Sequence, residues 1–389
     1  MEQQSPYSPP IKWPSQGNRL PKEIFNREDV FREELKRIFM GPEWHLVAHV
    51  AEVPKVGDFK QALIGQAPVL IIRGQDGVVR TFQNSCSHRG TQLAVEWSGN
   101  FQTNIVCPYH RWSFGLDGQL LGAPGMERFP AGWDKSQWGM VQLKSEVING
   151  CVFATFAENP PPVQEYLGDD VTRLIEESFG PAEDVELVGY QKVIFSSNWK
   201  ECTDNEGYHA PLLHSAFRLL QWQGGGGSQQ MSEYGHKYVQ APLKPAKAQF
   251  LNDSTLVEFQ DEKSLRKSTI LGFFPSSVIT KHLDTINLRF VMPLSSGETE
   301  LHYAYFRPRG DDPALREHTL HQASNLLGPS GLISLEDGAV YNRLHRGSFA
   351  PADVVFQKGW GWPEVEQNDE VSNLMRWERY RKIMEFERD

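Results

Sequence analysis

The sequence has little of what marks several large protein classes. No apolar run among its 389 residues approaches the roughly 18 residues that a membrane-spanning helix requires. Lysine and arginine total 39 against 49 aspartates and glutamates, with no basic cluster, so we expect neither nucleic-acid nor membrane-surface binding. Cysteine occurs only four times, too rarely for a disulfide scaffold. Residues 1–21 are rich in proline and contain no apolar signal segment, so we expect a cytoplasmic protein.

The remaining composition is that of a globular enzyme. Apolar residues make up 39% and charged residues 23% of the chain, which suffices for a large buried core. At about 150 residues per domain, the length favours two domains or one large domain with an insertion. Because the expected compartment is reducing, each of the few cysteines needs an explanation of its own.

The hydrophobic pattern changes twice along the chain. Apolar residues on one face predict a helix over 27–39, and we expect the arm and helix of residues 1–43 to pack with the C-terminal domain. In residues 44–157, short apolar runs between Gly, Asp and Asn turns predict a compact antiparallel β domain. Its clearest strands are the segments APVLIIRG, GVVRTFQN and GCVFATF. The Pro-rich linker 158–162 opens the last part, residues 158–389.

The part after the linker mixes helices with strands. Strands are predicted at Glu186–Ser196, at Thr255–Glu258 and in the segments FFPSSVITKHL, INLRFVMPL and TELHYAYFRP. Helices are predicted over 163–179, 312–327, 332–345 and 366–387. Four consecutive glycines, Gly224–Gly227, predict a mobile loop, because glycine loses the most conformational freedom on ordering.

Two of the cysteines lie close to histidines. Cys86 is two residues before His88, and after eighteen further residues Cys107 is three residues before His110. Thiolates and imidazoles from two loops indicate a metal site. Zinc is one interpretation, although a zinc finger normally has two Cys in one loop and two His in the other. One Cys and one His from each loop suit a Rieske [2Fe–2S] centre better, in which one iron binds both thiolates and the other both imidazoles.

The segments CSHRG and CPYHRW resemble the two cluster loops of the Rieske family. The gap of eighteen residues is slightly long for that family, which suggests an extra residue in the hairpin. Two neutral imidazoles in place of thiolates raise the reduction potential to roughly −150 mV or above, against about −400 mV for plant-type clusters. The resemblance therefore implies an electron carrier, and a second group must receive the electron.

A second pair of histidines, His209 and His214, follows the segment NWK. Five residues place them about 140° apart on an ideal helix, so one metal can bind both only if the helix breaks. Pro211 lies between them and gives a reason for such a break. By spacing alone, one core and one surface histidine explain the pair as well as metal binding does.

The YHxxxxH run resembles the mononuclear iron motif of Rieske non-haem iron oxygenases. In that family, two histidines and a later carboxylate form a facial triad with open positions for O2. The segment LGPSGLISLEDGAV resembles the family's carboxylate segment, which implies Asp337 as the third ligand and Glu336 as the second choice. A solvated helix face is the other interpretation of this acidic pair.

The family also has a carboxylate three residues before the first histidine, which connects the cluster of one subunit with the iron of the next. That position is Glu206 here, where many relatives have Asp. The segment from Trp199 to His209 is slightly shorter than expected, so Asp204 is the fallback for this bridge. A carboxylate beside a metal-bound histidine also fixes the tautomer and orientation of the ring.

The chain resembles large subunits that act on aromatic carboxylates, such as those of salicylate 5-hydroxylase and terephthalate dioxygenase. The segments VPKVGDFKQ, EYLG and YHAPLLH contribute to this similarity. A carboxylate substrate needs a bidentate partner, and Arg289 stands where similar sequences carry Arg, with a surface charge as the alternative. Cys151 and Cys202 have no ligand neighbours and are predicted to be inert packing residues.

The resemblance implies an α+β fold with a β-rich Rieske [2Fe–2S] domain and a catalytic domain that has a central antiparallel sheet flanked by helices. It implies a terminal oxygenase that uses Fe(II), O2 and electrons from NAD(P)H, passed on by a separate reductase or ferredoxin, to mono- or dihydroxylate an aromatic ring. The bridge at Glu206 implies a homotrimer, with or without small β subunits. The glycine loop could be part of a lid.

Three alternatives stay open at this stage. A Rieske oxygenase could instead demethylate an amine or betaine, or cleave its C–N bond. A pure electron-transfer Rieske protein would need neither a second iron site nor a large C-terminal region. A zinc-binding structural protein would contain metal without sulfide.

Overall fold

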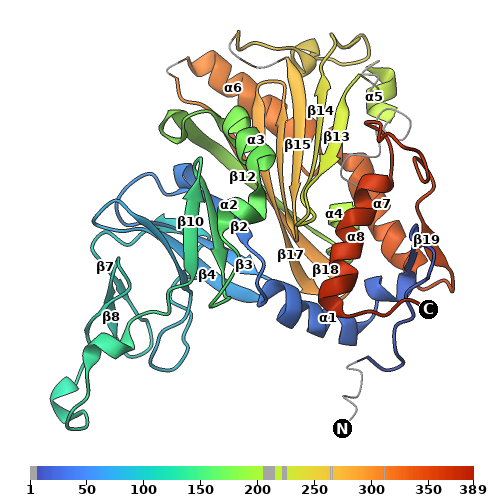
Figure 1. Ribbon diagram of the computed structural model, residues 1–389. Coiled ribbons are helices and arrows are strands. Elements are labelled where there is room, and N and C mark those ends of the chain that lie inside the picture. The colour runs from blue at the N-terminus through green and yellow to red at the C-terminus, as the bar shows by residue number, and fades with distance from the viewer. Residues whose placement is uncertain (1–6, 205–214, 221–225, 263, 265, 311) are drawn as a thin grey trace. The chain divides into compact units, whose positions relative to one another are not determined.

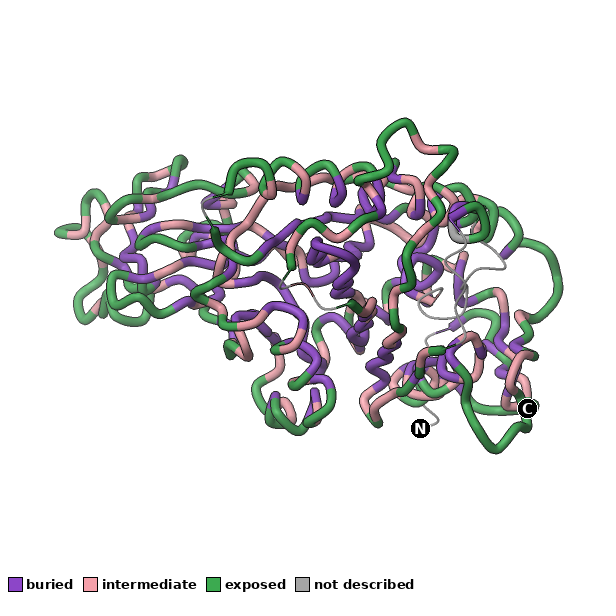
Figure 2. The backbone as a smooth tube through the Cα atoms, turned by 90° about the horizontal axis from the view of Figure 1, so that it is seen from above, coloured by how far each residue is buried: buried purple, intermediate pink, exposed green. Residues whose placement is uncertain are grey.

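The computed structural model describes residues 7–204, 215–220, 226–262, 264, 266–310 and 312–389 (Figure 1). Gly224 and Gly225 of the predicted mobile loop lie outside these residues. The chain divides into one unit of residues 40–163 and another of residues 1–39 with 164–389. Exposed residues follow the outer loops, and buried residues occupy the interior (Figure 2). No helix within the described ranges is both long and apolar enough to cross a membrane.

The unit of residues 40–163 consists of small antiparallel sheets. Its strands are β2 (His45–His49), β3 (Asp58–Ile64), β4 (Ala67–Arg73), β5 (Val79–Gln83), β6 (Ser98–Asn100), β7 (Asn104–Val106), β8 (Ser113–Gly115), β9 (Leu120–Gly122), β10 (Lys144–Ile148) and β11 (Cys151–Thr155). They form sheets of order β10-β11-β2, β5-β4-β3-β6 and β7-β8-β9. The segments APVLIIRG, GVVRTFQN and GCVFATF contain β4, β5 and β11, which confirms these strand predictions.

A seven-stranded antiparallel sheet forms the centre of the other unit. Its strands are β12 (Val185–Phe195), β13 (Ser228–Met231), β14 (Lys237–Pro242), β15 (Lys267–Phe273), β16 (Ser277–His282), β17 (Thr285–Ser295) and β18 (Glu298–Pro308). Across the sheet their order is β12-β18-β17-β16-β15-β14-β13. β12, β17 and β18 confirm the strands predicted at Glu186–Ser196, INLRFVMPL and TELHYAYFRP. The segment FFPSSVITKHL is divided between β15 and β16, because Pro275 lies in the turn between them and has no N–H for a ladder.

Helices flank this sheet and confirm the expected α+β class (Figure 1). They include α1 (Glu28–Glu34), the π-helical η2 (Leu35–Phe39), α2 (Val163–Leu167), α3 (Asp169–Phe179), α4 (Glu201–Asp204), α5 (Ser215–Leu219), α6 (Pro313–Gln322), the π-helical η8 (Ala323–Leu327), α7 (Ser334–Ser348) and α8 (Val371–Met384). The helix predicted over 163–179 is interrupted at Gly168, whose φ of 77° is left-handed. β1 (Arg19–Pro21) and β19 (Asp353–Val355) form a small antiparallel pair.

The strand predicted at Thr255–Glu258 is wrong. These residues lie largely in a 3-10 turn, η7 (Ser254–Val257). Asp253 caps the turn, because its Oδ1 accepts from the backbone N–H of Thr255 at 3.0 Å and from its hydroxyl at 2.6 Å. Such local capping competes with strand formation and outweighs the strand propensity of the apolar and β-branched residues here.

A buried carboxylate fixes the start of α4. Glu34 accepts hydrogen bonds from Trp199 Nε1 at 2.8 Å, from Lys200 Nζ at 2.5 Å and from the Tyr380 hydroxyl. Lys200 is buried as well, and a buried charge is tolerated only when it is paired. Glu34 belongs to α1 and Tyr380 to α8, so both helices anchor the residues that precede α4.

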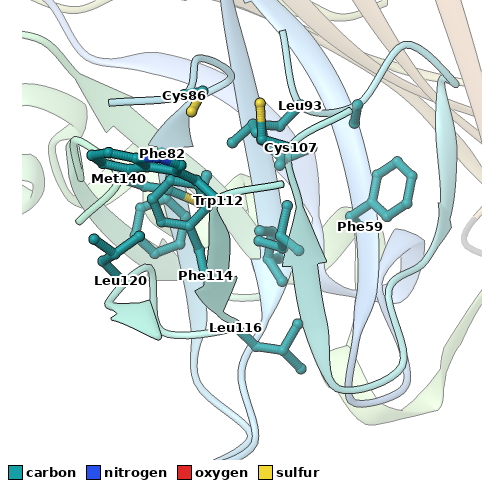
Figure 3. Close-up of a cluster of buried hydrophobic side chains, with 14 residues drawn as sticks. Phe59, Phe82, Cys86, Leu93, Cys107, Trp112, Phe114, Leu116, Leu120 and Met140 are labelled. Carbon is teal, nitrogen blue, oxygen red and sulfur yellow. The ribbon is translucent and has the colours of Figure 1, made fainter. Parts of the chain in front are cut away.

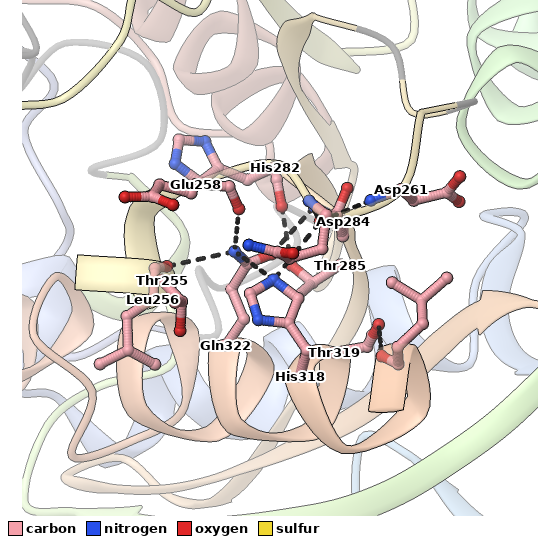
Figure 4. A network of polar contacts seen from close by, with 12 residues as sticks. Thr255, Leu256, Glu258, Asp261, His282, Asp284, Thr285, His318, Thr319 and Gln322 are labelled. Atoms are coloured by element: carbon pink, nitrogen blue, oxygen red, sulfur yellow. Dashed lines mark hydrogen bonds and ion pairs between the residues drawn. The ribbon is translucent and has the colours of Figure 1, made fainter. Parts of the chain in front are cut away.

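Gln322, the last residue of α6, anchors the segment of residues 256–258 to this helix (Figure 4). Its Nε2 donates to the carbonyls of Leu256 at 3.1 Å and Glu258 at 3.0 Å, and its Oε1 accepts from the N–H of Asp284 at 2.9 Å. Asp284 Oδ2 in turn accepts from the N–H of Gln260 at 2.6 Å. Gln322 is fully buried, so water cannot replace these bonds.

Gln322→Leu is expected to lower the free energy of unfolding by about 2–5 kcal/mol, because two carbonyls and one N–H lose their partner. Denaturant unfolding followed by circular dichroism measures this loss. Glu317→Gln changes an exposed position of the same helix and, as the control, should alter the value by less than about 0.5 kcal/mol. Superimposable unfolding curves for Gln322→Leu and the wild type would contradict the stabilising role.

Candidate functional site

Two loops in the unit of residues 40–163 present the four predicted cluster residues. In each loop the cysteine N–H donates to the carbonyl five residues ahead, and the cysteine carbonyl accepts from the N–H four residues ahead. These bonds join Cys86 to Thr91 and Gly90 at 2.8 and 2.9 Å, and Cys107 to Trp112 and Arg111 at 2.8 and 3.1 Å. The fourth residue has a positive φ in both loops, 72° at Gly90 and 62° at Arg111. The loops thus share one backbone form, although only the first has glycine at the strained position.

In the two loops, the thiols lie beside each other and so do the imidazoles. Cys86 and Cys107 are 3% and 2% exposed, and their thiols are close enough for Cys107 to raise the pKa of Cys86, which is raised mainly by burial. Both sulfur atoms lie at one edge of a buried apolar cluster (Figure 3). The ring centroids of His88 and His110 are 4.8 Å apart. The thiols are therefore paired with each other, and so are the imidazoles.

Aromatic rings hold the two imidazoles in place. Trp112 stacks on His88 with the ring centroids 4.7 Å apart and the planes 5° apart. The ring of Tyr109 lies 3.7 Å from that of His110, centroid to centroid. Trp112 also contacts Trp133 edge-on. These contacts restrict rotation of the imidazoles and keep their rings side by side.

The four donors fit two irons better than a single ion. A structural zinc ion would need all four donors within about 2.0–2.3 Å of one point. A pair of thiols beside a pair of imidazoles is the donor set of two irons, one for each pair.

The second predicted site is described only in part. His209, His214 and Glu206 fall in the range 205–214, outside the described residues. Asp337 lies in the first turn of α7. The structure describes Asp204 and Ser215, the residues on either side of this range, and the carboxylate of Asp337.

Both flanks lie at the start of α7. Ser215, the residue after His214, donates its N–H to Glu336 Oε1 at 3.1 Å. Asp204 and Asp337 line the same cavity of about 570 Å³. Because Glu336 already bonds the backbone of α5, this geometry favours Asp337 over Glu336 as a metal ligand.

Asp204 is held by α8. Its Oδ1 accepts from Trp377 Nε1 at 2.7 Å, and its carbonyl accepts from Asn373 Nδ2 at 2.8 Å. Burial raises the pKa of the Asp204 carboxyl, which disfavours the ionised form. These contacts give Asp204 a structural role as an anchor of α4.

The other two cysteines have the environment of unreactive thiols. Cys151 in β11 is 0% exposed and Cys202 in α4 is 1% exposed. Burial raises the pKa of both thiols, so the reactive thiolate form is suppressed.

Arg289 lies in β17, inside the seven-stranded sheet. Its Nη2 donates to Thr280 Oγ1 at 3.4 Å. Arg289 lies opposite Tyr303 of β18, which lies opposite Gln191 of β12, so these three side chains point to the same face. Phe195, four residues after Gln191 on β12, points to this face too and contacts Tyr341 of α7 with the ring centroids 5.3 Å apart. The guanidinium therefore lies on the side of the sheet that α7 covers.

Two family models match the chain. A model of the Rieske [2Fe-2S] domain matches residues 43–144, and a model of the catalytic domain of ring-hydroxylating alpha subunits matches residues 179–383. The first range contains all four predicted cluster residues, and the second contains the predicted iron ligands.

Relatives of known activity match nearly the whole chain. It is 31% identical over 404 residues to the large subunit of anthranilate 1,2-dioxygenase from Burkholderia cepacia, covering 95% of the chain and 94% of that protein. The chain belongs to the ring-hydroxylating oxygenase alpha subunits. Terephthalate 1,2-dioxygenase alpha subunit 2 from Comamonas sp is 31% identical, covering 96% of the chain and 97% of that protein. The salicylate 5-hydroxylase large component from Ralstonia sp is 28% identical, with 85% of each chain covered.

Solved structures of this class share the fold. A naphthalene 1,2-dioxygenase matches with a TM-score of 0.80 at 22% identity, covering 95% of this chain and 93% of that one. A quaternary ammonium Rieske monooxygenase matches with a TM-score of 0.77, also at 22% identity, covering 97% and 99%. A shorter sequence match is the glycine betaine monooxygenase oxygenase subunit of Pseudomonas aeruginosa, 33% identical over 52% of this chain and 47% of that protein.

Membership of this family defines the type of enzyme. A ring-hydroxylating alpha subunit is an oxidoreductase that incorporates oxygen from O2, and it works with a reductase as the terminal oxygenase. Its cofactors are a Rieske [2Fe–2S] cluster and a mononuclear iron. The two thiols and two imidazoles of the loops fit the cluster. The described residues on either side of 205–214 lie near Asp337 at the start of α7, which fits the mononuclear iron.

Proposed function

We propose that this alpha subunit hydroxylates an aromatic carboxylate with O2 and with electrons from NAD(P)H through a reductase. The supporting observation is Arg289, whose side chain lies on the face of the sheet that is covered by α7, the helix that contains Asp337. A guanidinium binds a carboxylate through two parallel hydrogen bonds, so it can hold an aromatic acid with its ring near the metal. The relatives named for anthranilate, terephthalate and salicylate are consistent with such a substrate.

Cys86 and Cys107 would hold one iron of the cluster, and His88 and His110 the other. The pairing of thiol with thiol and of imidazole with imidazole supports this assignment. The buried thiols would lie on the protein side, and the more exposed imidazoles would face outward.

His209, His214 and Asp337 would hold the mononuclear iron. Support comes from Ser215, which follows His214 directly and bonds the neighbour of Asp337. When bound, this iron activates O2 with electrons received from the cluster, for mono- or dihydroxylation of the ring. The chain itself contributes the ligands, the anchor for the substrate carboxylate and an apolar surround.

Glu206 would connect the cluster of one subunit with the iron of its neighbour in a homotrimer, with or without small β subunits. Its position three residues before His209 supports this role. The alternative carboxylate, Asp204, has one oxygen engaged by Trp377, which favours Glu206.

Arg289→Gln is expected to raise KM for aromatic acids and to lower kcat/KM about 10- to 150-fold, because a hydrogen bond to a charged group contributes about 1.5–3 kcal/mol. Steady-state O2 uptake measures both constants. Arg289→Lys keeps the charge without the planar fork and should lose less. An unchanged KM in Arg289→Gln would place the acid-binding group elsewhere.

A second candidate function is oxidative demethylation or C–N cleavage of an amine such as a betaine. Glu336, Asp337 and Glu370 line the 570 Å³ cavity, and their carboxylates would attract a quaternary ammonium group. Arg289 on the same side of the sheet would repel it, which favours the aromatic acid.

Substrate-dependent O2 uptake with product analysis separates the two functions. The holoenzyme with a reductase is given a panel of aromatic acids and quaternary amines. Ring-hydroxylated products from the acids would support the proposal. Release of formaldehyde or another aldehyde from the amines, with no product from any acid, would overturn it.

A further inference from the structure

A polar row crosses the middle of the seven-stranded sheet. Asn287 and Arg289 are two residues apart on β17, so their side chains point to the same face. Asn287 lies opposite Thr280 of β16 and opposite Tyr305 of β18. Because Arg289 Nη2 reaches back to Thr280 Oγ1 at 3.4 Å, the guanidinium and the carboxamide of Asn287 occupy neighbouring positions on this face.

Asn287 differs from its neighbours in this row. Tyr305 donates its hydroxyl to Gln191 Oε1 at 2.8 Å, and Gln191 Nε2 donates to Ser324 Oγ at 3.2 Å. Asn287 is 2% exposed, and within the described part of the chain its Oδ1 has no hydrogen-bond partner. A buried acceptor without a partner lowers the stability of the fold. Its presence is explained if the group accepts a hydrogen bond from a ligand.

Described helical segments near the predicted iron ligands cover the face that carries this row. The hydrogen bond from Gln191 places η8 over it. η8 belongs to an apolar cluster that contains Ala216, Leu220, Leu283, Leu326, Leu327 and Ile333. Ala216 is two residues after His214, and Ile333 is four residues before Asp337. The polar row and the apolar cluster therefore lie on the same side of the sheet as Ala216 and Ile333.

We propose that Asn287 Oδ1 accepts a hydrogen bond from an amino or hydroxyl group ortho to the carboxylate of the substrate. The inference rests on the proposed function and narrows its substrate class to ortho-amino and ortho-hydroxy aromatic acids. Arg289 holds the carboxylate, and the ring lies against the apolar cluster. Neighbouring positions on one face of a sheet are about 5–8 Å apart, so two such groups can hold adjacent ring substituents, whereas a para substituent points away.

Anaerobic calorimetry on the holoenzyme tests this assignment with 2-aminobenzoate, benzoate and 4-aminobenzoate. In the wild type, 2-aminobenzoate should bind about 10- to 100-fold more tightly than benzoate, because only the ortho donor satisfies the buried acceptor. In Asn287→Leu this ratio should fall to within about 3-fold, through loss of 2-aminobenzoate affinity. 4-Aminobenzoate should follow benzoate in both proteins.

Two further variants keep the test independent of folding. Asn287→Asp retains an oxygen acceptor and should keep the ortho preference, although its charge weakens the binding of every acid. Thr280→Val removes a partner of Arg289 and should weaken all acids alike without changing the ratio. Cluster absorbance and melting temperature confirm that each variant is folded.

The outcomes distinguish the inference from the function on which it rests. An unchanged ratio in folded Asn287→Leu, with acids still bound, would overturn the role of Asn287 and leave the proposed function standing. A wild-type holoenzyme that binds none of the aromatic acids would overturn both.

Discussion

Asp337→Ala is expected to lose the mononuclear iron and to turn over more than about 100-fold more slowly, because even hydrogen-bond partners of metal ligands contribute about 10- to 100-fold. The cluster loops belong to the other unit of the chain, so the cluster should remain. The ratio of iron to sulfide should fall from about 3:2 to about 1:1. Iron and sulfide analysis with EPR spectroscopy of both centres measures this change.

Glu336→Gln is the matched control for Asp337→Ala. Glu336 Oε1 accepts the N–H of Ser215 at 3.1 Å, and glutamine keeps an oxygen that can accept this bond. The variant should therefore retain the iron and most of the activity. If Glu336→Gln loses the iron while Asp337→Ala keeps it, the third ligand is Glu336.

Cys86→Ala is expected to eliminate the [2Fe–2S] cluster, with complete loss of acid-labile sulfide and of the red-brown absorbance. One iron of a Rieske cluster is held by two thiolates, and removal of one leaves that iron without a full ligand set. Turnover should cease as well, because the iron site no longer receives electrons. Absorbance spectra and sulfide analysis of the purified variant measure the effect.

Cys151→Ala is the matched control, because Cys151 is an equally buried thiol in the same unit. Its thiol packs in β11 and should be replaceable with only a small cavity. The variant should keep the cluster and its absorbance. Equal loss of sulfide in both variants would show that the effect arises from misfolding and not from ligation.

Long apolar strands could be predicted from the sequence. β17 and β18 bury most of their residues, so INLRFVMPL and TELHYAYFRP are strongly apolar and are predicted correctly. Thr255–Glu258 has the same residue types over a shorter stretch, where the single hydrogen-bonding side chain of Asp253 decides the conformation. The prediction fails there because local capping is stronger than the hydrophobic pattern of a short segment.

The candidate site was predictable where its residues are close in sequence. Cys86, His88 and their counterparts in the second loop form a dense pattern of metal-binding residue types, which indicates a cluster site directly. The contact between Ser215 and Glu336 joins residues 121 positions apart, and no local pattern predicts it. The position of Asn287 depends on the register of β17 with β16 and β18, so in the sequence it is one polar residue in an apolar strand.

A single turnover under ¹⁸O2 tests most directly the central claim, that the two iron centres of this chain together insert oxygen into an aromatic acid. The holoenzyme is reduced chemically, freed of reductant and mixed with aromatic acids and ¹⁸O2 in the absence of a reductase. We predict a ring-hydroxylated product that carries ¹⁸O, formed as the cluster is re-oxidised. Re-oxidation of the cluster without labelled product from any aromatic acid would contradict the claim.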